Sequence, residues 1–223
     1  ADVVCSTATF NEDIVGDREF DLVVIDEACQ STEPGCWIPV LRADRIVLAG
    51  DHCQLPPTVL SKQATKDGLQ MSLLERLVEH YGDAVTRKLD KQYRMHTHIM
   101  DFSSARFYDG SLIAHESVAS HRLHDLPHVA ESTRTLEPVE FIDTAGSGWE
   151  EEIEPDGLSK RNTSEGELVL RKVQQLRDTG LAASDIAVIA PYAAQVRWLR
   201  QNADSDRLEI DTVDGFQGRE KEA

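Results

Sequence analysis

The chain is organised around one stretch, Leu22-Val23-Val24-Ile25-Asp26-Glu27-Ala28-Cys29-Gln30. Four apolar residues in succession, three of them β-branched, predict a buried strand of a parallel sheet. Two carboxylates follow where the strand ends. Because ligands of open α/β sheets bind at the carboxyl ends of strands, we expect Asp26 and Glu27 to face a ligand. Taken alone, the stretch is equally well interpreted as a solvated acidic turn after a core strand.

A second strand with a polar end follows closely and argues against the plain turn. Residues 45–49 are mostly apolar and run into Gly50-Asp51, and the next loop holds Gln54 before two prolines. An apolar strand ending in Asp-Glu is typical of the Walker B motif. There the aspartate holds hydrated Mg²⁺ and the glutamate positions or deprotonates the attacking water. A glutamine on the neighbouring strand end can bond both that water and a terminal phosphate.

The rest of the chain repeats strand, polar end and helix, which predicts an α/β fold with a parallel sheet. Further strands are expected at 3–9, 85–89, 139–143, 186–190 and near 210. Helices are expected at about 33–40, 71–81, 98–107, 164–178 and 195–202, with a mobile acidic loop at 146–162. The polar strand ends fall into two groups, before and after about residue 92. This grouping predicts two α/β units that share one cleft.

Four residues elsewhere in the chain carry possible ligand chemistry. Tyr93 and Arg94 come after the strand expected at 85–89. An arginine there can reach a γ-phosphate and an aromatic ring can stack on a base, although a surface pair is the more common interpretation. In the turn after the first strand, Thr7 can hold a phosphate, or it is part of a plain Ser/Thr turn. Glu220 can accept a ribose hydroxyl.

Composition restricts the class of protein. The 223 residues include 40 acidic and 23 basic ones, and the net charge of −17 argues against a simple basic nucleic-acid patch. No apolar run of about 18 residues exists, so we expect no membrane span, and the N-terminus does not resemble a signal peptide. Because carboxylates are dense and only 7 of the basic residues are Lys, we expect a cytoplasmic protein of a prokaryote, a halophilic archaeon. The abrupt ends predict a fragment of a longer protein.

Neither the cysteines nor the histidines show a full metal-binding framework, although the spacing of the histidines is compatible with a metal. The cysteines are Cys5, Cys29, Cys36 and Cys53, without a C-x-x-C pair, and we interpret them as buried, reduced thiols, with zinc as the alternative. A histidine-rich segment contains His115, His121, His124 and His128. We interpret it as a solvated connection, again with zinc as the alternative.

The order of the motifs resembles a superfamily 1 helicase of the 5′-to-3′ class, in the branch of the nonsense-mediated-decay RNA helicase and the immunoglobulin mu-binding DNA helicase. The segments that carry it are Val24-Ile25-Asp26-Glu27-Ala28 (motif II), Gly50-Asp51-His52-Cys53-Gln54-Leu55-Pro56-Pro57 (motif III), Gln92-Tyr93-Arg94-Met95-His96 (motif IV) and Val213-Asp214-Gly215-Phe216-Gln217-Gly218-Arg219-Glu220-Lys221 (motif V). Cys5-Ser6-Thr7 and Ala190-Pro191-Tyr192 with Gln195 also match. The resemblance runs from end to end.

This resemblance implies two RecA-like parallel-sheet domains of the P-loop NTPase fold, both incomplete. Residues 1–92 would be the C-terminal part of domain 1 and residues 93–223 a truncated domain 2. The implied function is an ATP-dependent helicase or translocase that moves 5′-to-3′ on single-stranded DNA or RNA, with ATP and Mg²⁺ as cofactors. It would be a monomeric motor whose accessory domains lie outside this segment.

The resemblance also implies residue roles. The catalytic residues would be Asp26, Glu27, Gln54 and Arg94, with Asp26 binding Mg²⁺ and Glu27 activating water. The nucleotide contacts would be Gln54 and Arg94 at the γ-phosphate, Tyr93 on adenine, Glu220 on the ribose and Gly218 beside the phosphates. The single-strand track would be Thr7, Thr58, Pro191 and Thr212.

Two parts of the family pattern are absent from the 223 residues. No G-x-x-x-x-G-K-[ST] occurs, and the motif VI arginine is missing. We therefore expect the chain alone to bind ATP poorly and hardly to hydrolyse it. Two other functions stay open: a non-catalytic clamp for nucleic acid or protein on a degenerate motor fold, and a Mg²⁺-dependent nuclease. A nuclease would need carboxylates converging from several elements, and Asp26-Glu27 is the one strand-end pair with supporting neighbours.

Overall fold

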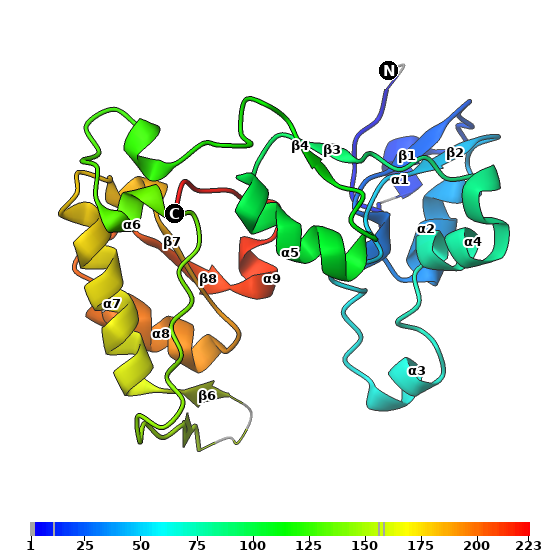
Figure 1. Ribbon diagram of the computed structural model, residues 1–223. Helices are drawn as coiled ribbons and strands as arrows, with labels where there is room; N and C mark the ends of the chain where they lie inside the picture. The colour runs from blue at the N-terminus through cyan, green and yellow to red at the C-terminus, as the bar shows by residue number, and fades with distance from the viewer. Residues whose placement is uncertain (1–2, 11, 156, 158) are drawn as a thin grey trace. The chain divides into compact units, whose positions relative to one another are not determined.

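A computed structural model describes residues 3–10, 12–155, 157 and 159–223. The chain divides into two compact units, Ala1–Lys88 (unit 1) and Leu89–Ala223 (unit 2). Both contain short parallel sheets and helices (Figure 1), so the predicted α/β class is confirmed at this level.

Unit 1 is built on one parallel strand pair. The strands are β1 (Val23–Ile25) and β2 (Ile46–Leu48), paired Val23↔Ile46, Val24↔Val47 and Ile25↔Leu48. The helices are α1 (Glu12–Val15), α2 (Glu33–Val40), α3 (Lys62–Lys66) and α4 (Leu73–Tyr81), with 3₁₀ turns η1 (Ala28–Gln30) and η2 (Gly82–Ala84). Because α2 lies between the two strands in sequence, the unit contains the crossover that parallel strands need.

Helix α4 supplies much of the core of unit 1. Its apolar residues Leu73, Leu74, Leu77 and Val78 recur on one helical face. Ser72 caps the helix, since its hydroxyl accepts a hydrogen bond from Glu75 N at 3.1 Å, and Gly82 ends it with φ 53°. The buried face packs with Ile25, Ala28 and Cys36, so α4 is held against the end of β1.

The predicted burial of the β1 and β2 strands is only half right. Ile25 is buried, whereas Val24 is 62% exposed and its partner Val47 is 48% exposed. Side chains of neighbouring strand residues point to opposite faces. One face therefore packs on the α4 side, and within the described part of the chain the opposite face remains open to solvent.

Unit 2 contains three two-stranded sheets among its described residues. Strands β3 (Lys91–Gln92) and β4 (Ile113–Ala114) are parallel, β5 (Glu152–Ile153) and β6 (Lys160–Arg161) antiparallel, and β7 (Ala187–Ala190) and β8 (Glu209–Thr212) parallel. The helices are α5 (Thr97–Phe107), α6 (Thr133–Leu136), α7 (Thr163–Arg177), α8 (Ala193–Asn202) and α9 (Val213–Phe216). The 3₁₀ turns are η3 (Leu123–Asp125) and η4 (Ala183–Asp185).

The core of unit 2 lies where α7 and α8 meet the β7–β8 pair (Figure 1). Val188 and Ile210 contribute from the strands, and Val173 and Leu199 from the helices. The two helices approach so closely that a Cβ at Gly166 would clash with the Trp198 ring. This buried cluster fixes the carboxyl ends of β7 and β8.

Four predicted segments differ from the structure. Residues 3–9, 85–89 and 139–143 are not strands, and 146–162 contains the hairpin β5–β6. The strand expected at 85–89 is replaced by β3, because backbone pairing with Ile113 and Ala114 begins only at Lys91. Opposite charges support the hairpin across its strands: Lys160 pairs with Glu151 at 2.7 Å and Arg161 with Glu152 at 2.6 Å.

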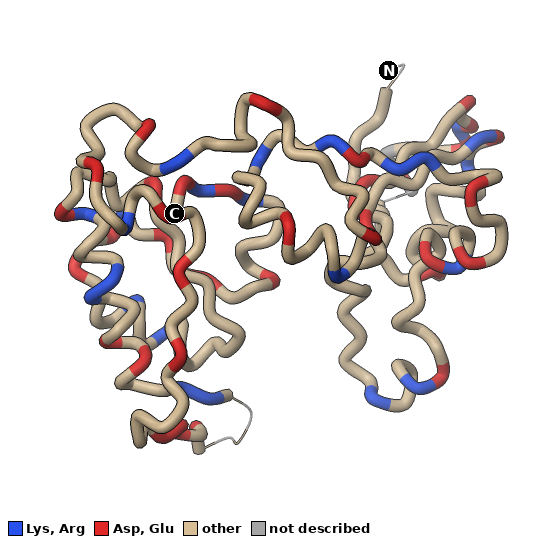
Figure 2. The backbone as a smooth tube through the Cα atoms, viewed as in Figure 1, with Lys and Arg blue, Asp and Glu red and all other residues tan. Residues whose placement is uncertain are grey.

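The buried-thiol interpretation holds for two cysteines. Cys29 and Cys36 are buried, and burial raises the pKa of both thiols. Cys53 is half-buried and Cys5 is exposed, so the interpretation is wrong for Cys5. Among the residues that the structure describes, the segment around Cys5 has no sheet partner. Across the described residues, no helix has the length and apolar character needed to cross a membrane. Basic residues are scattered among acidic ones in both units (Figure 2).

A core substitution tests the packing of unit 2. Leu199 is 1% exposed, so Leu199→Ala should lower the free energy of unfolding by about 2–5 kcal/mol through lost burial and a residual cavity. Leu89 is 90% exposed, and Leu89→Ala is the matched control, expected within about 0.5 kcal/mol of the parent. Urea unfolding followed by circular dichroism measures both variants, and equal midpoints would contradict the assigned core.

Candidate functional site

The two strand ends of unit 1 are joined by backbone hydrogen bonds. Ala49 N donates to Ile25 O at 2.9 Å, and Ala28 N donates to Ala49 O at 2.8 Å. Gly50 lies so close to the β1 loop that a Cβ there would come within 3.1 Å of Ala28 N. The loops after β1 and β2, which carry motifs II and III, are thus held side by side.

Glu27 has an unusual backbone conformation for a residue other than glycine. Its φ and ψ are 49° and 39°, in the left-handed region, which costs such a residue on the order of 1 kcal/mol or more. Its N–H donates to Asp26 Oδ1 at 3.0 Å, and its Oε2 accepts from Gln30 Nε2 at 2.9 Å. Both carboxylates are exposed, so the strained turn presents them to solvent at the end of β1.

Gln54 is tethered to the end of β2 by Asp51. Its Nε2 donates to Asp51 Oδ2 at 2.8 Å, while Asp51 Oδ1 accepts from Cys53 N at 3.0 Å. Asp51 N in turn donates to Cys29 Sγ at 3.4 Å. Through these contacts the glutamine loop is tied to the loop that carries Glu27.

Two places in unit 1 offer metal ligands. Asp26 fits Mg²⁺, because it is an exposed carboxylate at a strand end and Mg²⁺ takes hard oxygen ligands. The sequence interpretation did not single out the second place, where donor atoms of Asp51, His52 and Cys53 lie within 4.8 Å of one another. Its imidazole and thiol are softer donors that suit Mg²⁺ poorly.

In unit 2 the side chain of Gln92 shapes the turn that carries Tyr93 and Arg94. Its Oε1 accepts from both Arg94 N and Met95 N at 2.8 Å, and its Nε2 donates to Met95 O at 2.8 Å. Arg94 Nε donates to Glu220 Oε2 at 2.7 Å. The fold thus brings together two predicted site residues that are 126 positions apart in the chain.

Two other predicted residues share the carboxyl edge of the β7–β8 pair. Thr212 is paired with Ala190, and Pro191 follows directly. The Thr212 hydroxyl also has a structural role, since it accepts from Gly215 N at 3.2 Å and caps α9. Gly218 has φ 78° and open space around its Cα, so it permits a turn that other residues adopt with strain.

Thr7 and Thr58 are both exposed and lie on separate segments of unit 1. Within the described residues, no hydrogen bond joins either of them to Asp26, Glu27 or Gln54. Their roles, like those of the other predicted site residues, stay predictions.

The histidine-rich segment does more than connect elements. The His115 ring stacks on Tyr93, His121 Nε2 lies 3.0 Å from Glu222 Oε2, and His124 Nδ1 lies 3.2 Å from Thr135 O. No local pattern indicates the His115 contact, because the contact depends on the pairing of β3 with β4. His115 is therefore a candidate functional residue that sequence reasoning missed.

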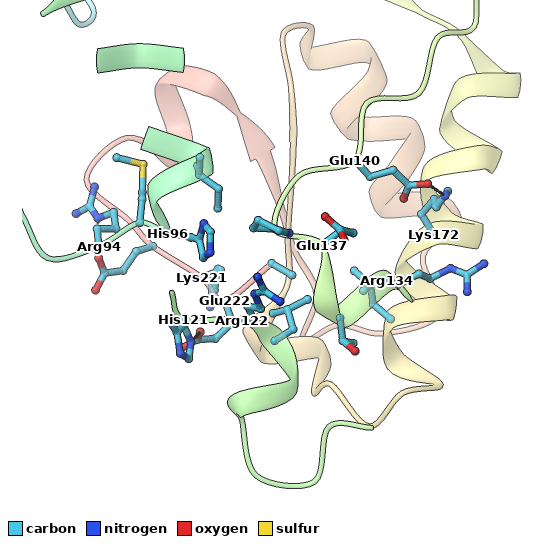
Figure 3. A pocket seen from close by; sticks show the side chains of 18 of the residues that line it. Arg94, His96, His121, Arg122, Arg134, Glu137, Glu140, Lys172, Lys221 and Glu222 are labelled. Atoms are coloured by element: carbon cyan, nitrogen blue, oxygen red, sulfur yellow. Dashed lines mark hydrogen bonds and ion pairs between the residues drawn. The ribbon is translucent and has the colours of Figure 1, made fainter. Parts of the chain in front are cut away.

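A cavity of about 620 Å³ opens beside Arg94 and Glu220 in unit 2. Cationic and acidic side chains line it together, and Figure 3 shows His96, His121 and Arg122 on one part of its wall. Two of the lining residues, Arg219 and Lys221, hydrogen-bond Glu209 and lower the pKa of that carboxyl. The lining near Arg94 therefore contains both basic and acidic side chains, including Glu220.

His96 is buried at the start of α5, where its Nδ1 accepts from His98 N at 3.0 Å. Burial lowers the pKa of His96, and the nearby His98 and Arg122 lower it further, while Asp101 opposes them. The lowered pKa means that folding favours the neutral form of the ring.

Replacing His96 tests this assignment. His96→Asn keeps a side chain that can cap α5 but removes the titratable ring. Because the folded pKa lies below that of the unfolded chain, the unfolded state takes up a proton first as the pH falls, and the folded state loses stability. Wild-type α5 amides should thus exchange hydrogen faster than those of His96→Asn at about pH 5, and the difference should shrink at about pH 7.5, above the ordinary imidazole pKa of about 6.5.

The exposed His128 provides the matched control. His128→Asn should follow the wild type at both pH values. A difference between wild type and His96→Asn that does not change with pH would contradict the lowered pKa of His96.

Comparison with known proteins covers nearly all of the chain. Two family models, both described as "AAA domain", match residues 1–62 and 69–223. The second match spans more than half of the chain.

Three similar proteins are described by function. "DNA-binding protein SMUBP-2" of Mesocricetus auratus is 50% identical over 230 residues, which cover 100% of this chain and 23% of that protein. "DNA polymerase alpha-associated DNA helicase A" of Schizosaccharomyces pombe is 43% identical over 213 residues, 92% of this chain and 32% of that protein. "Regulator of nonsense transcripts 1 homolog" of Neurospora crassa is 38% identical over 236 residues, 100% of this chain and 21% of that protein. The chain thus spans a third or less of each relative's length.

Proposed function

We propose that this chain, which belongs to the AAA-domain superfamily 1 helicases of the nonsense-mediated-decay and mu-binding branch, is part of an ATP-dependent motor. The motor would act on single-stranded nucleic acid. The observation that carries the proposal is the parallel pairing of β1 with β2. That pairing brings Asp26 and Glu27 to the same edge as the Gln54 loop.

Unit 1 would supply the groups for hydrolysis. When bound at Asp26, Mg²⁺ would supply charge neutralisation for the phosphates. Glu27 would accept a proton from the attacking water, because its carboxylate is held at a fixed backbone position and remains exposed. Gln54 would leave its hydrogen bond with Asp51 to orient water or a terminal phosphate.

Unit 2 would supply nucleotide contacts. Tyr93 would stack on the base, Arg94 would bind the γ-phosphate and Glu220 would accept a hydrogen bond from the ribose. The existing ion pair supports a shared location for Arg94 and Glu220. Gly218 would allow close approach of the backbone to the phosphates.

The nucleic-acid track would include Thr7 and Thr58 in unit 1 and Pro191 and Thr212 in unit 2. The printed names of the relatives, a DNA-binding protein, a DNA helicase and a regulator of nonsense transcripts, support single-stranded DNA or RNA as the partner. The motor would be monomeric and would move 5′-to-3′ along the strand. With a net charge of −17, local phosphate contacts rather than overall charge would hold the strand.

The two units, Ala1–Lys88 and Leu89–Ala223, would correspond to the two incomplete RecA-like domains predicted at 1–92 and 93–223. The parallel crossover in unit 1 and the β7–β8 pair in unit 2 support this assignment. The acidic composition supports a cytoplasmic, halophilic prokaryotic source.

A Glu27→Gln variant of the full-length protein tests the hydrolytic role. Loss of the general base should lower kcat for nucleic-acid-stimulated ATP hydrolysis by about 10²–10⁴-fold. Bound ATP should be retained and affinity for a single strand should be unchanged. Steady-state phosphate release and fluorescence anisotropy with a labelled oligonucleotide measure the two effects.

Glu79 is an exposed glutamate on α4, and Glu79→Gln is the matched control that should hydrolyse ATP at the wild-type rate. Near-normal hydrolysis by Glu27→Gln would end the assignment of Glu27. A wild type that binds nucleic acid without any ATP turnover would instead favour the non-catalytic clamp.

The proposed halophilic source has its own test. Dense surface carboxylates repel one another less when salt screens them, so the free energy of unfolding should rise steeply toward molar KCl. Urea unfolding at low and high KCl measures this. Full stability in dilute buffer would contradict the proposal without affecting the proposed motor.

A further inference from the structure

The rings of Tyr93 and His115 form a stacked pair in unit 2. Their centroids are 4.3 Å apart and the ring planes are inclined by 28°. Tyr93 follows β3 and His115 follows β4, and the parallel ladder continues past both strands because His115 N donates to Gln92 O at 2.9 Å. Paired residues of neighbouring strands point to the same side, so strand register places one ring against the other.

Contacts with Ser117 at the Nδ1 atom hold the His115 ring in place. Ser117 N donates to His115 Nδ1 at 3.2 Å, and Ser117 Oγ lies 2.8 Å from the same nitrogen. A backbone N–H can only donate, so Nδ1 is the acceptor and the ring proton is assigned to Nε2. His115 is therefore fixed both by its backbone and by its ring.

The side chain of Tyr93 is less restrained than that of His115. Its residue surface is 61% exposed, and in the part of the chain that the structure describes its hydroxyl makes no hydrogen bond. Gln92 fixes the backbone of the turn but not the rotamer of Tyr93. The stack on His115 covers one face of the tyrosine ring and leaves the other accessible.

We propose that His115 is a positioning residue for base recognition, which holds Tyr93 so that its free face receives the base of a nucleoside triphosphate. This inference rests on the proposed function, because it assigns a support to the ring expected to bind adenine. A ring already held in its bound rotamer loses less conformational entropy when the base binds. Since every base has a π-face, the pair adds affinity without selecting adenine over guanine.

The test compares His115→Ala with His115→Phe in the full-length protein. The Ala variant frees the tyrosine ring, and the KM for ATP should rise about three- to tenfold, as expected for loss of one aromatic contact, with kcat unchanged. The Phe variant keeps an aromatic face without the Ser117 contacts and should restore KM to within about twofold of the wild type. The KM for GTP should rise by the same factor as that for ATP.

Inorganic tripolyphosphate separates base binding from general damage to the site. It carries the phosphates without a base, so its inhibition constant should be the same in His115→Ala and in the wild type. The matched control is His80→Ala in unit 1, which removes another His–Tyr ring contact, that of His80 with Tyr81 at 4.5 Å. His80→Ala should leave every constant unchanged.

Several outcomes would overturn the inference. They are an unchanged KM in His115→Ala, a His115→Phe variant as impaired as His115→Ala, an equal loss of tripolyphosphate inhibition, or a fall in kcat alone. If the wild type hydrolyses ATP normally, these outcomes contradict only the proposed role of His115. A wild-type protein that neither binds nor hydrolyses nucleoside triphosphates would contradict both the proposed function and this inference.

Discussion

Two parallel strands end at the same edge of a sheet, and this constraint places several of the candidate side chains. In unit 1 the pairing of Ile25 with Leu48 brings Asp26 and Glu27 beside the loop of Gln54. In unit 2 the β3–β4 register sets Tyr93 against His115, and the β7–β8 register sets Pro191 near Thr212. The candidate chemistry therefore depends on backbone pairing more than on local side-chain contacts.

Polar side chains then fix the loops that leave these strands. Asp51 accepts hydrogen bonds from Cys53 and Gln54, and Gln92 both accepts from and donates to its own turn. An irregular loop lacks the regular backbone hydrogen bonds of a helix or sheet. These side chains provide alternative hydrogen bonds and so stabilise the loop conformation. The left-handed backbone of Glu27 is maintained in the same way, through Asp26 and Gln30.

The sequence predicts the elements whose signals are local. The periodicity of Leu73, Leu74 and Leu77 gives α4, and the apolar run at 186–190 gives β7. Residues 85–89 show why a strand was predicted in the wrong place. Val85 and Thr86 are β-branched and favour strands, but a strand needs a paired neighbour, and pairing begins only at Lys91. The stack of His115 on Tyr93 has no local signal for the same reason. Glu27, Gln54 and Arg94 are candidates because they follow expected strands, and their roles come from the family resemblance.

The ion pair between Arg94 and Glu220 has a consequence for competition among anions. Both side chains are more than half exposed, so dissolved salt screens the attraction between them. A phosphate group can displace the glutamate, because it offers the guanidinium two parallel hydrogen bonds and a higher charge. Displacement would also free Glu220 at that moment, so a bound phosphate would exchange the partners of both side chains.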